Sequence, residues 1–299
     1  MTLQRVTRFL RKTPEQQRTT LRFFARKSLS RLPFIPVPLR IEIAPGRPLS
    51  LWWSLLPTAD HPNRTLLEYA GDDCSELRFL WEFLKPGMTF FDVGAHHGVY
   101  SLLAARKLCS GDTVIAFEPS PRERRRFQLH LQMNEVTHVR LEPYAVSARS
   151  GAFDFFTVTS GFTTMSSLQR PAIDHPIRKI SIEAVSLDDY LNQRRIPSID
   201  LMKIDVEGGE LQAFAGATRL LQLLRPIIIC EVLDWVTQPW GYAAREIVSC
   251  LQRHAYVWFD FAEDGKIALH EPRHEYPETR NYLAVPREKL ALVEAWRRA

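Results

Sequence analysis

The chain has 299 residues, with 39 Lys and Arg against 34 Asp and Glu, so its formal net charge is +5. No apolar run approaches the ~18 residues that a membrane-spanning helix needs. The four cysteines are scattered, without the spacing of a metal site or a disulfide framework. Length and composition therefore favour a cytoplasmic protein with one main domain, and they argue against a transmembrane helix and a disulfide-stapled scaffold.

The positive charge is concentrated at the N-terminus. Residues 1–40 contain ten Lys or Arg and a single acid, Glu15, whereas residues 41–299 carry 29 basic and 33 acidic side chains. Leu and Phe alternate with the arginines of residues 1–32, so this arm is predicted to be a helix that packs on its own core or on a second subunit. The alternative is peripheral contact with an anionic membrane or a partner protein. Nucleic acid is disfavoured as a partner, because the main domain is not basic.

Proline spacing separates the arm from the rest of the chain. Five prolines fall between residues 33 and 48 and mark a linker. The predicted organisation is an arm and proline-rich linker (1–48), a small β element packed on the core (49–75) and a main domain (76–299).

The main domain opens with the most informative motif, FDVGAHHG at residues 91–98. It lies where a short apolar strand turns into a helix. Gly94 and Gly98 allow a tight turn and a close approach to a ligand, beside the unpaired N–H groups of the helix N-terminus. The motif is not the G-x-G-x-x-G of dinucleotide sites. Asp92 would repel phosphate but attract a cationic or hydroxyl-bearing ligand, and S-adenosylmethionine, with ammonium and sulfonium charges, fits.

The next predicted strand, 113–117, ends in Glu118. In doubly wound sheets an acid at the end of the second strand binds the ribose hydroxyls of a nucleotide cofactor. Ser120 and Glu123 form a capping box that starts the following helix, so Glu118 is held in a short βα loop. An ordinary surface acid at a strand end is the alternative interpretation.

Apolar strands continue to alternate with helical patterns along the chain. This alternation predicts an α/β fold, a doubly wound, mostly parallel sheet with helices on both faces. The expected parallel strands are 88–93, 113–117, 138–141, 199–204 and 227–232, and the expected helices are 100–108, one from 120, 208–224, 243–253 and 288–298. We also expect a strand at 153–158, a hairpin of 256–261 with 266–269, and a polar loop, 159–178, that shapes the acceptor pocket.

Charged residues interrupt the fourth predicted parallel strand, although a buried parallel strand should be apolar throughout. Lys203 and Asp205 lie two apart on one face, and Glu207 directly precedes the Gly-Gly that opens the next helix. Burying such charges is costly unless they are paired or face a site. An ion pair of Lys203 with either acid explains part of this pattern, and a functional role for at least one acid is favoured.

Four motifs in a fixed order, FDVGAHHG, AFEPSP, SLDDYL and KIDVEGGE, identify the chain as similar to the FkbM family of methyltransferases. The similarity spans roughly residues 76–286. It implies a class I methyltransferase fold, Rossmann-like, with S-adenosyl-L-methionine as the methyl donor. The acceptor in this family is usually a hydroxyl on a sugar, glycoconjugate or secondary metabolite.

Carried over position by position, the resemblance also implies roles for single residues. The cofactor-binding residues would be Asp92, Gly94, His96, Gly98 and Glu118. Asp205 and Glu207 would line the mouth of the site beside the methyl group. The family commonly has Asn where this chain has His96, a change that keeps hydrogen bonding but adds a titratable group.

The reaction itself limits which side chains can act. An aliphatic hydroxyl is a poor nucleophile near neutral pH and needs a base or a Lewis-acidic metal. The predicted catalytic acids are Asp205, Glu207 and Glu231, although Glu231 can equally be a structural strand end; His96 or His97 is a second source of a base. A divalent metal held by these acids ranks below a protein base, because their spacing is not diagnostic.

Other classes of function remain as alternatives. A non-catalytic cofactor-binding or scaffold protein would keep residues 92–118 without any acceptor chemistry. A nicotinamide-dependent oxidoreductase is disfavoured by the missing second glycine of G-x-G-x-x-G. A nucleic-acid methyltransferase is disfavoured by the charge of the main domain.

Overall fold

The computed structural model describes residues 37–44, 47–53, 75–108, 113–160, 162–262 and 265–298. The predicted basic arm, residues 1–32, lies outside them. Before the main domain, the structure describes an antiparallel hairpin of β1 (Val37–Ala44) and β2 (Arg47–Trp53). β structure therefore begins inside the predicted proline-rich linker rather than at residue 49. Proline is tolerated there, because each strand of a two-stranded sheet is an edge strand.

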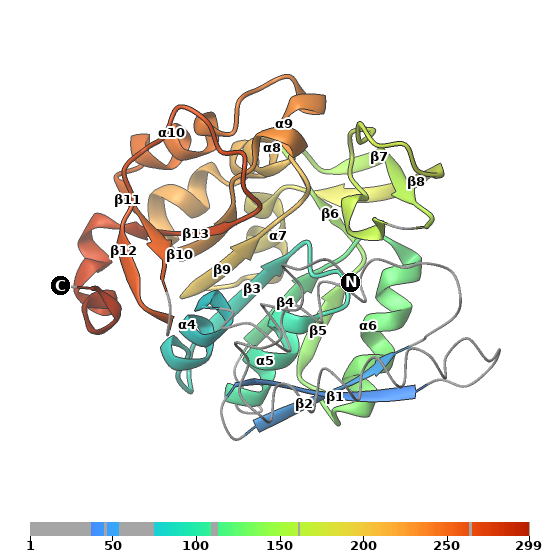
Figure 1. Cartoon of the computed structure of the whole chain (residues 1–299), viewed down its shortest axis with the longest axis horizontal. Coiled ribbons are helices and arrows are strands. Elements are labelled where there is room, and N and C mark those ends of the chain that lie inside the picture. The colour runs from blue at the N-terminus through green and yellow to red at the C-terminus, as the bar shows by residue number, and fades with distance from the viewer. Residues whose placement is uncertain are drawn as a thin grey trace, which may run out of the picture.

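An eight-stranded sheet forms the centre of the main domain, in the order β12-β11-β13-β10-β9-β3-β4-β5 (Figure 1). Its strands are β3 (Thr89–Val93), β4 (Thr113–Phe117), β5 (Val139–Glu142), β9 (Leu201–Ile204), β10 (Ile227–Glu231), β11 (Tyr256–Phe261), β12 (Ile267–Leu269) and β13 (Asn281–Pro286). The strands from β10 to β5 are parallel, and β13, β11 and β12 extend the sheet in antiparallel pairing. The predicted doubly wound α/β fold is confirmed, with its five parallel strands.

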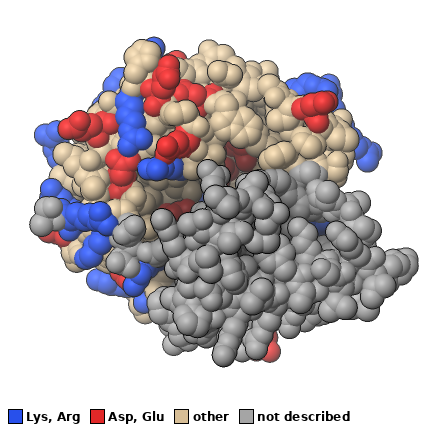
Figure 2. Space-filling model, viewed as in Figure 1, with Lys and Arg blue, Asp and Glu red and all other residues tan. Residues whose placement is uncertain are grey.

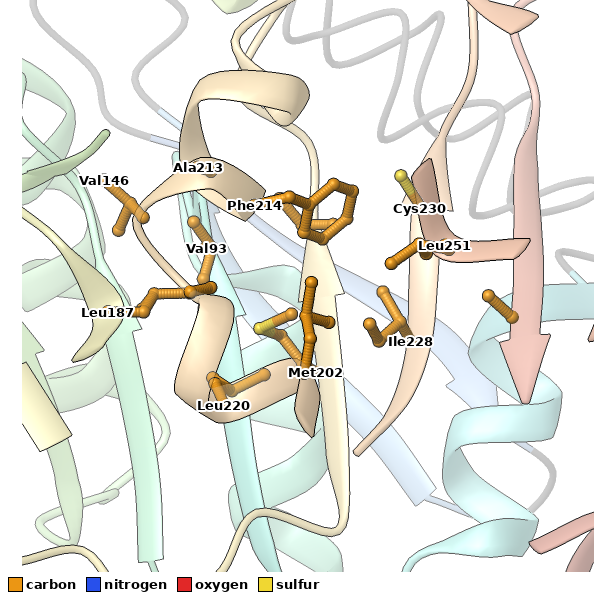
Figure 3. Close-up of a cluster of buried hydrophobic side chains, with 14 of the residues drawn as sticks. Val93, Val146, Leu187, Met202, Ala213, Phe214, Leu220, Ile228, Cys230 and Leu251 are labelled. Atoms are coloured by element: carbon orange, nitrogen blue, oxygen red, sulfur yellow. The ribbon is translucent and has the colours of Figure 1, made fainter. Parts of the chain in front are cut away.

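Successive side chains of the central strands point to opposite faces, so the sheet carries two cores. On β3, Phe90 belongs to one core and Phe91 to the other. The first core is covered by α4 (Ser75–Phe83), α5 (Val99–Lys107), α6 (Pro121–Met133) and the 3₁₀ helix η5 (Arg287–Trp296), and the second by α7 (Leu187–Arg194), α8 (Glu210–Ala215), the π-helical turn η2 (Leu220–Leu224) and α10 (Arg245–Arg253). Figure 3 shows the second core, where Met202 and Ile228 from neighbouring strands pack with Phe214 of α8.

The helix expected over residues 208–224 is divided into α8 and η2. The division falls at Gly216, where an added Cβ would lie 2.2 Å from the carbonyl oxygen of Ser147. The backbone therefore passes close against a neighbouring segment, and only glycine fits. The last predicted helix, 288–298, is also different, since it is the 3₁₀ helix η5. No helix in the described ranges is both long and apolar enough to cross a membrane.

A smaller sheet of β6 (Ala145–Val146), β8 (Ile177–Val185) and β7 (Gly151–Val158) stands beside the carboxyl end of the main sheet (Figure 1). Only β7 was expected from the sequence. The loop between β7 and β8 contains a 3₁₀ turn, η1 (Thr163–Met165), and folds back so that Ser167 pairs with Phe156.

The order of the main sheet reverses between β3 and β9. From β3 the chain proceeds outward through β4 and β5, and then returns to start β9 and β10 on the other side. The loops that follow β3 and β9 leave in opposite directions, and this arrangement opens a crevice at the carboxyl ends of the two strands.

Candidate active site

A cavity of about 150 Å³ lies at this reversal point. The loop after β3, the end of β4, the β7–β8 loop and the segment after β9 all line it. Five of the site residues predicted from the sequence line the cavity, namely Gly94, His96, Glu118, Asp205 and Glu207. The other three, Asp92, Gly98 and Glu231, are not among its lining residues.

The loop after β3 is held close to the sheet. The N–H groups of Gly94 and Ala95 donate to the carbonyl oxygen of Phe117, at 3.1 and 2.9 Å. His96 has a φ of 49°, and this left-handed conformation suits Asn and His better than most residues. The conformation explains how histidine can stand where the sequence resemblance leads us to expect asparagine.

Gly94 passes directly against the segment after β9. Its φ is 78°, and an added Cβ would lie 1.9 Å from the carbonyl oxygen of Asp205. Gly98 is similar, since a Cβ there would lie 2.0 Å from the ring of Phe127. The two glycines therefore let the loop fit between two neighbouring elements, and Gly98 acts through this packing.

A pair of alanine substitutions should separate the backbone strain at Gly94 from its steric contact. Gly87 has a φ of 91° with nothing within 4 Å of an added Cβ, so Gly87→Ala should cost only about 1–2 kcal/mol of unfolding free energy. Gly94→Ala should cost a further ~1–3 kcal/mol, because a backbone carbonyl cannot move aside. Urea denaturation measures both values, and equal costs would show that the contact with Asp205 is unimportant.

Asp92 lies beneath the loop and is fully buried. Its Oδ2 accepts hydrogen bonds from the N–H of Ser101 at 3.1 Å and from its hydroxyl at 2.6 Å. Burial raises the pKa of Asp92, against the opposing effects of Lys203 and Ser101. Asp92 thus fixes the start of α5 from below, and its direct contact with a cofactor stays a prediction.

Lys203 is buried between the loop and the acids. Its Nζ donates to the carbonyl oxygen of Gly94 at 3.0 Å and lies 3.4 Å from Oδ2 of Asp205 and 3.9 Å from Oδ1 of Asp92. Burial alone would lower the pKa of Lys203, but the two carboxylates outweigh burial and raise it. Lys203 is therefore the cation that ties β3 and β9 together at the cavity.

Glu118 is almost fully buried, with one edge in the cavity. Its Oε2 accepts the N–H of His96 at 2.8 Å and its Oε1 accepts the N–H of Ser120 at 2.7 Å. Each carboxylate oxygen has two lone pairs, so each can accept one further hydrogen bond from a ligand. Burial raises the pKa of Glu118 to about 7.

The structure brings four acids together at the ends of β9 and β10. Asp205 and Glu207 line the cavity, and Glu210 and Glu231 are buried beside them. One carboxylate oxygen each of Asp205, Glu210 and Glu231 lies within 4.8 Å of the others. Burial, and then the charge of Asp205, raise the pKa of Glu207 and of Glu231 well above the ordinary value.

The sequence interpretation gave Glu210 no role, although it is the last residue of KIDVEGGE. Its Oε1 accepts the N–H of Val206 at 2.9 Å, so the side chain turns back toward the strand end. Burial raises the pKa of Glu210 to about 7. The signal that could have identified it is its place in the first turn of a helix that begins at a strand's carboxyl end.

Glu123 was expected to complete a capping box, and only half of that box forms. The N–H of Glu123 donates to Oγ of Ser120 at 3.4 Å. The carboxylate does not return to the N–H of Ser120, which Glu118 occupies, but instead bonds Nε2 of His97 and lies 3.6 Å from Nε2 of His96. Glu123 is thus a cavity-lining residue that sequence reasoning missed.

The stacked rings of His96 and His97 have centroids 3.8 Å apart. Burial, and then the charge of His97, lower the pKa of His96 well below the ordinary value, so this imidazole is neutral near pH 7. Burial would raise the pKa of Glu123. The hydrogen bond from His97, together with the nearby histidines and Arg122, outweighs burial and lowers that pKa. Nδ1 of His130 contacts the carbonyl oxygen of His97 at 2.9 Å and holds the pair in place.

A glycine loop after the first parallel strand, an acid after the second and a cavity at the reversal of the strand order together are typical of a nucleotide-cofactor site on a doubly wound sheet. Residues 92–258 match the family described as the methyltransferase FkbM domain, a match over more than half of the chain. The chain therefore belongs to the FkbM methyltransferase family.

Relatives with assigned names are moderately similar. The 31-O-demethyl-FK506 methyltransferase FkbM of Streptomyces tacrolimicus is 30% identical over 208 residues, 58% of this chain and 74% of that protein. The hexuronic acid methyltransferase AglP of Haloferax volcanii is 26% identical over 155 residues, 51% of this chain and 59% of that protein. The chain thus spans less than two thirds of the length of AglP, and the same holds for methyltransferase 1 of Beauveria bassiana, matched over 56% of its length.

Among solved structures, methyltransferase FkbM from Methylobacillus flagellatus aligns with a TM-score of 0.41 and 16% identity. The alignment covers 66% of this chain and 43% of that one.

Proposed function

We propose that this protein transfers a methyl group from S-adenosyl-L-methionine to a hydroxyl oxygen of a sugar, glycoconjugate or secondary metabolite. One observation carries the proposal: Glu118 faces the same cavity as Asp205 and Glu207, at the reversal point of the sheet. A donor held by Glu118 on one side would present its methyl group to an acceptor beside the two acids on the other. The relatives named as acting on a hexuronic acid and on demethyl-FK506 support this class of acceptor.

The residues around the cavity fit the donor. Glu118 has lone pairs free for two ribose hydroxyls, and the absence of a Cβ at Gly94 leaves the loop close to the strand end. When bound, the donor supplies an electrophilic methyl group on a sulfonium, a cation that the carboxylate-rich end of β9 favours. These groups would also align the acceptor oxygen with the methyl group, an effect that can lower the barrier by several kcal/mol.

The acceptor must lose its proton as it attacks. Asp205 or Glu207 takes this proton on a carboxylate oxygen, since both line the cavity. Burial raises the pKa of Glu207, so its ionised carboxylate is a stronger base than that of an ordinary glutamate. His96 is the weaker candidate, because its lowered pKa reduces its affinity for a proton. A bound divalent metal remains the alternative activator.

Glu118→Gln should weaken the binding of S-adenosylmethionine by about 1–3 kcal/mol, because an amide offers one acceptor oxygen and no charge. Ribose hydroxyls bind the ionised carboxylate better. Because the pKa is about 7 in the free protein, affinity should rise from pH 6 to pH 8, and Glu118→Gln should remove that rise.

Calorimetric titration with donor and demethylated product measures these affinities. Glu142→Gln is the matched control, since Glu142 is also a buried acid at a strand end but bonds Tyr190 away from the cavity. Unchanged affinity in a folded Glu118→Gln protein would remove the ribose assignment.

Labelled-methyl transfer to a panel of sugars and hydroxylated metabolites tests the activity directly. Binding of the donor without transfer to any hydroxyl compound would favour a non-catalytic scaffold protein. Methylation of nucleic acid would favour a nucleic-acid methyltransferase.

The surface charge bears on the nucleic-acid alternative. On the face drawn in Figure 2, the described Lys and Arg are interspersed with Asp and Glu, a mixture that does not favour a nucleic-acid surface.

We also propose that the protein is cytoplasmic, because its scattered cysteines favour a reducing compartment.

The basic arm, residues 1–32, is expected to be dispensable for donor binding. Deleting residues 1–32 should leave donor affinity intact. If the arm contacts an anionic membrane, the full chain alone should bind anionic vesicles in a salt-sensitive manner, and equal vesicle binding by both proteins would rule that role out.

A further inference from the structure

The acids at the end of β9 and β10 exceed the positive charge available to them. Five carboxylates, those of Asp92, Asp205, Glu207, Glu210 and Glu231, gather at this end of the sheet, and among the described residues the one cation within ion-pair distance of any of them is Lys203. If all ionise, the group has a formal charge of −4. Carboxylates removed from water are costly unless a counter-charge or a proton compensates them.

Lys203 serves only one side of this group. Its Nζ lies within 4.0 Å of Asp205 and Asp92. Neither Glu210 nor Glu231 has a Lys, Arg or His side chain within that distance among the residues described here. The far side of the group therefore has carboxylates without a cationic partner.

Two of these carboxylates also have an oxygen without a hydrogen bond. Glu210 is 1% exposed and Glu231 is 8% exposed. Within the described ranges, Oε2 of each is shielded from solvent and has no hydrogen-bond partner. Buried polar atoms are nearly always paired, so two unpaired carboxylate oxygens in one cluster of acids indicate a missing ligand.

We propose that Asp205, Glu210 and Glu231 bind a divalent cation at the edge of the cavity. One oxygen from each lies within 4.8 Å of the other two, a separation that a shared ion can bridge. Three carboxylate oxygens form a hard ligand set, which suits Mg²⁺, Mn²⁺ or Ca²⁺. Three protein ligands leave coordination positions for water or for an acceptor oxygen.

A second cluster of possible metal ligands lines the cavity, but its carboxylate already has cationic partners. His96, His97 and Glu123 also place ligand atoms within 4.8 Å of one another. The carboxylate of Glu123, however, already pairs with Arg122 and lies 4.0 Å from Arg126. Two guanidinium groups beside one carboxylate disfavour an additional cation, so the acids of β9 and β10 are the better site.

The cation site has a consequence for the reaction that rests on the proposed function. Asp205 belongs both to the cation site and to the cavity wall, so an ion held there can contact the acceptor oxygen. A bound cation lowers the pKa of a coordinated hydroxyl. Glu207 lines the cavity but is not one of the three ligands, and it remains available to take the proton.

Titration of the full-length chain with Mn²⁺, followed by the loss of the free-ion electron paramagnetic resonance signal, tests the site without any methyl acceptor. One Mn²⁺ should bind per chain. Glu231→Gln and Glu210→Gln should each weaken binding at least about tenfold. The control is Glu142→Gln, a buried strand-end acid outside the cluster, which should bind as the unmodified chain does.

Thermal unfolding provides a second readout. Mn²⁺ should raise the melting temperature of the unmodified protein and of Glu142→Gln, and it should raise that of Glu231→Gln less. Absence of Mn²⁺ binding at millimolar concentration, or equal binding by Glu231→Gln and the unmodified chain, would overturn the proposal. Mn²⁺ binding by a chain that does not bind S-adenosylmethionine would instead refute the proposed function and leave the cation site standing.

Discussion

Glu207→Gln and Asp205→Asn are expected to lower the single-turnover rate of methyl transfer, by roughly 10²–10⁴ for whichever acid is the base. The amide keeps the shape of the side chain but cannot accept the proton. The backbone of Glu207 is held independently, because its carbonyl oxygen accepts from Trp240 at 3.2 Å and from Ser167 at 2.9 Å. The fold and most of the donor affinity should therefore survive.

The pH dependence of the rate separates the candidate bases. A base acts in its deprotonated form, so the rate should rise through its pKa. Burial raises the pKa of Glu207 and lowers that of His96, so the two candidate bases are shifted in opposite directions. A carboxylate base should give an inflection that disappears in Glu207→Gln or Asp205→Asn and persists in His96→Asn.

The comparison uses single-turnover rates of these variants and of Glu231→Gln, with and without chelator, once an acceptor is known. Near-normal rates in both Glu207→Gln and Asp205→Asn would reject a carboxylate base. Loss of the inflection in His96→Asn would assign the histidine instead. Loss of turnover with chelator and recovery with added Mg²⁺ would add a cation to the mechanism, as the cluster around Glu231 predicts.

The sheet could be predicted from the sequence because its parallel strands are short apolar runs bounded by turn residues. The strand β8 was missed, although Ile177, Ile180 and Ile182 lie in a segment of mixed polarity that pairs with β7. Half of its side chains face solvent, so the apolar run that marks a buried strand is absent. The break at Gly216 was missed for another reason, since it depends on the approach of residue 147.

The part of the site that depends on residues close together in the sequence could be predicted. Glu118 and Gly94 were selected because a strand end and a tight turn leave marks in the sequence. The positions of Glu123 and Asp92 depend on contacts across the fold: the first turns to His97, 26 residues away, and the second lies under the loop. Which carboxylate oxygens lack a hydrogen-bond partner among the described residues, as Oε2 of Glu210 does, follows only from the packed structure.

Lys203→Met should be among the most destabilising single changes in this domain. The side chain is 4% exposed and its ammonium is the counter-charge for Asp205 and for the fully buried Asp92. Removing one partner of a buried ion pair typically costs about 3–5 kcal/mol, because the other charge is left without compensation. At roughly 2–4 °C per kcal/mol, the melting temperature should fall by about 6–20 °C. The hydrogen bond to Gly94 is also lost, so donor affinity should fall with it.

Lys179→Met is the matched control. Lys179 also pairs with an aspartate, Asp154, at 2.7 Å, but both side chains are more than half exposed. Exposed pairs contribute little, so this change should cost less than about 1 kcal/mol. Similar losses at Lys179 and Lys203 would mean that burial of the pair is unimportant.

The pH dependence of the Lys203→Met defect has a defined sign. The raised pKa of Lys203 keeps the ammonium charged from pH 5 to pH 8, so its contribution to the unmodified protein is constant across that range. In the variant, the fully buried carboxylate of Asp92 loses its counter-charge, and protonation relieves the cost of that buried charge. The loss of melting temperature should therefore be largest at pH 8 and smaller at pH 5. Lys203→Met combined with Asp92→Asn should recover part of the loss at pH 8. Additive effects of the two changes, or a defect that grows toward pH 5, would contradict the assignment of Lys203 as the charge partner of these acids.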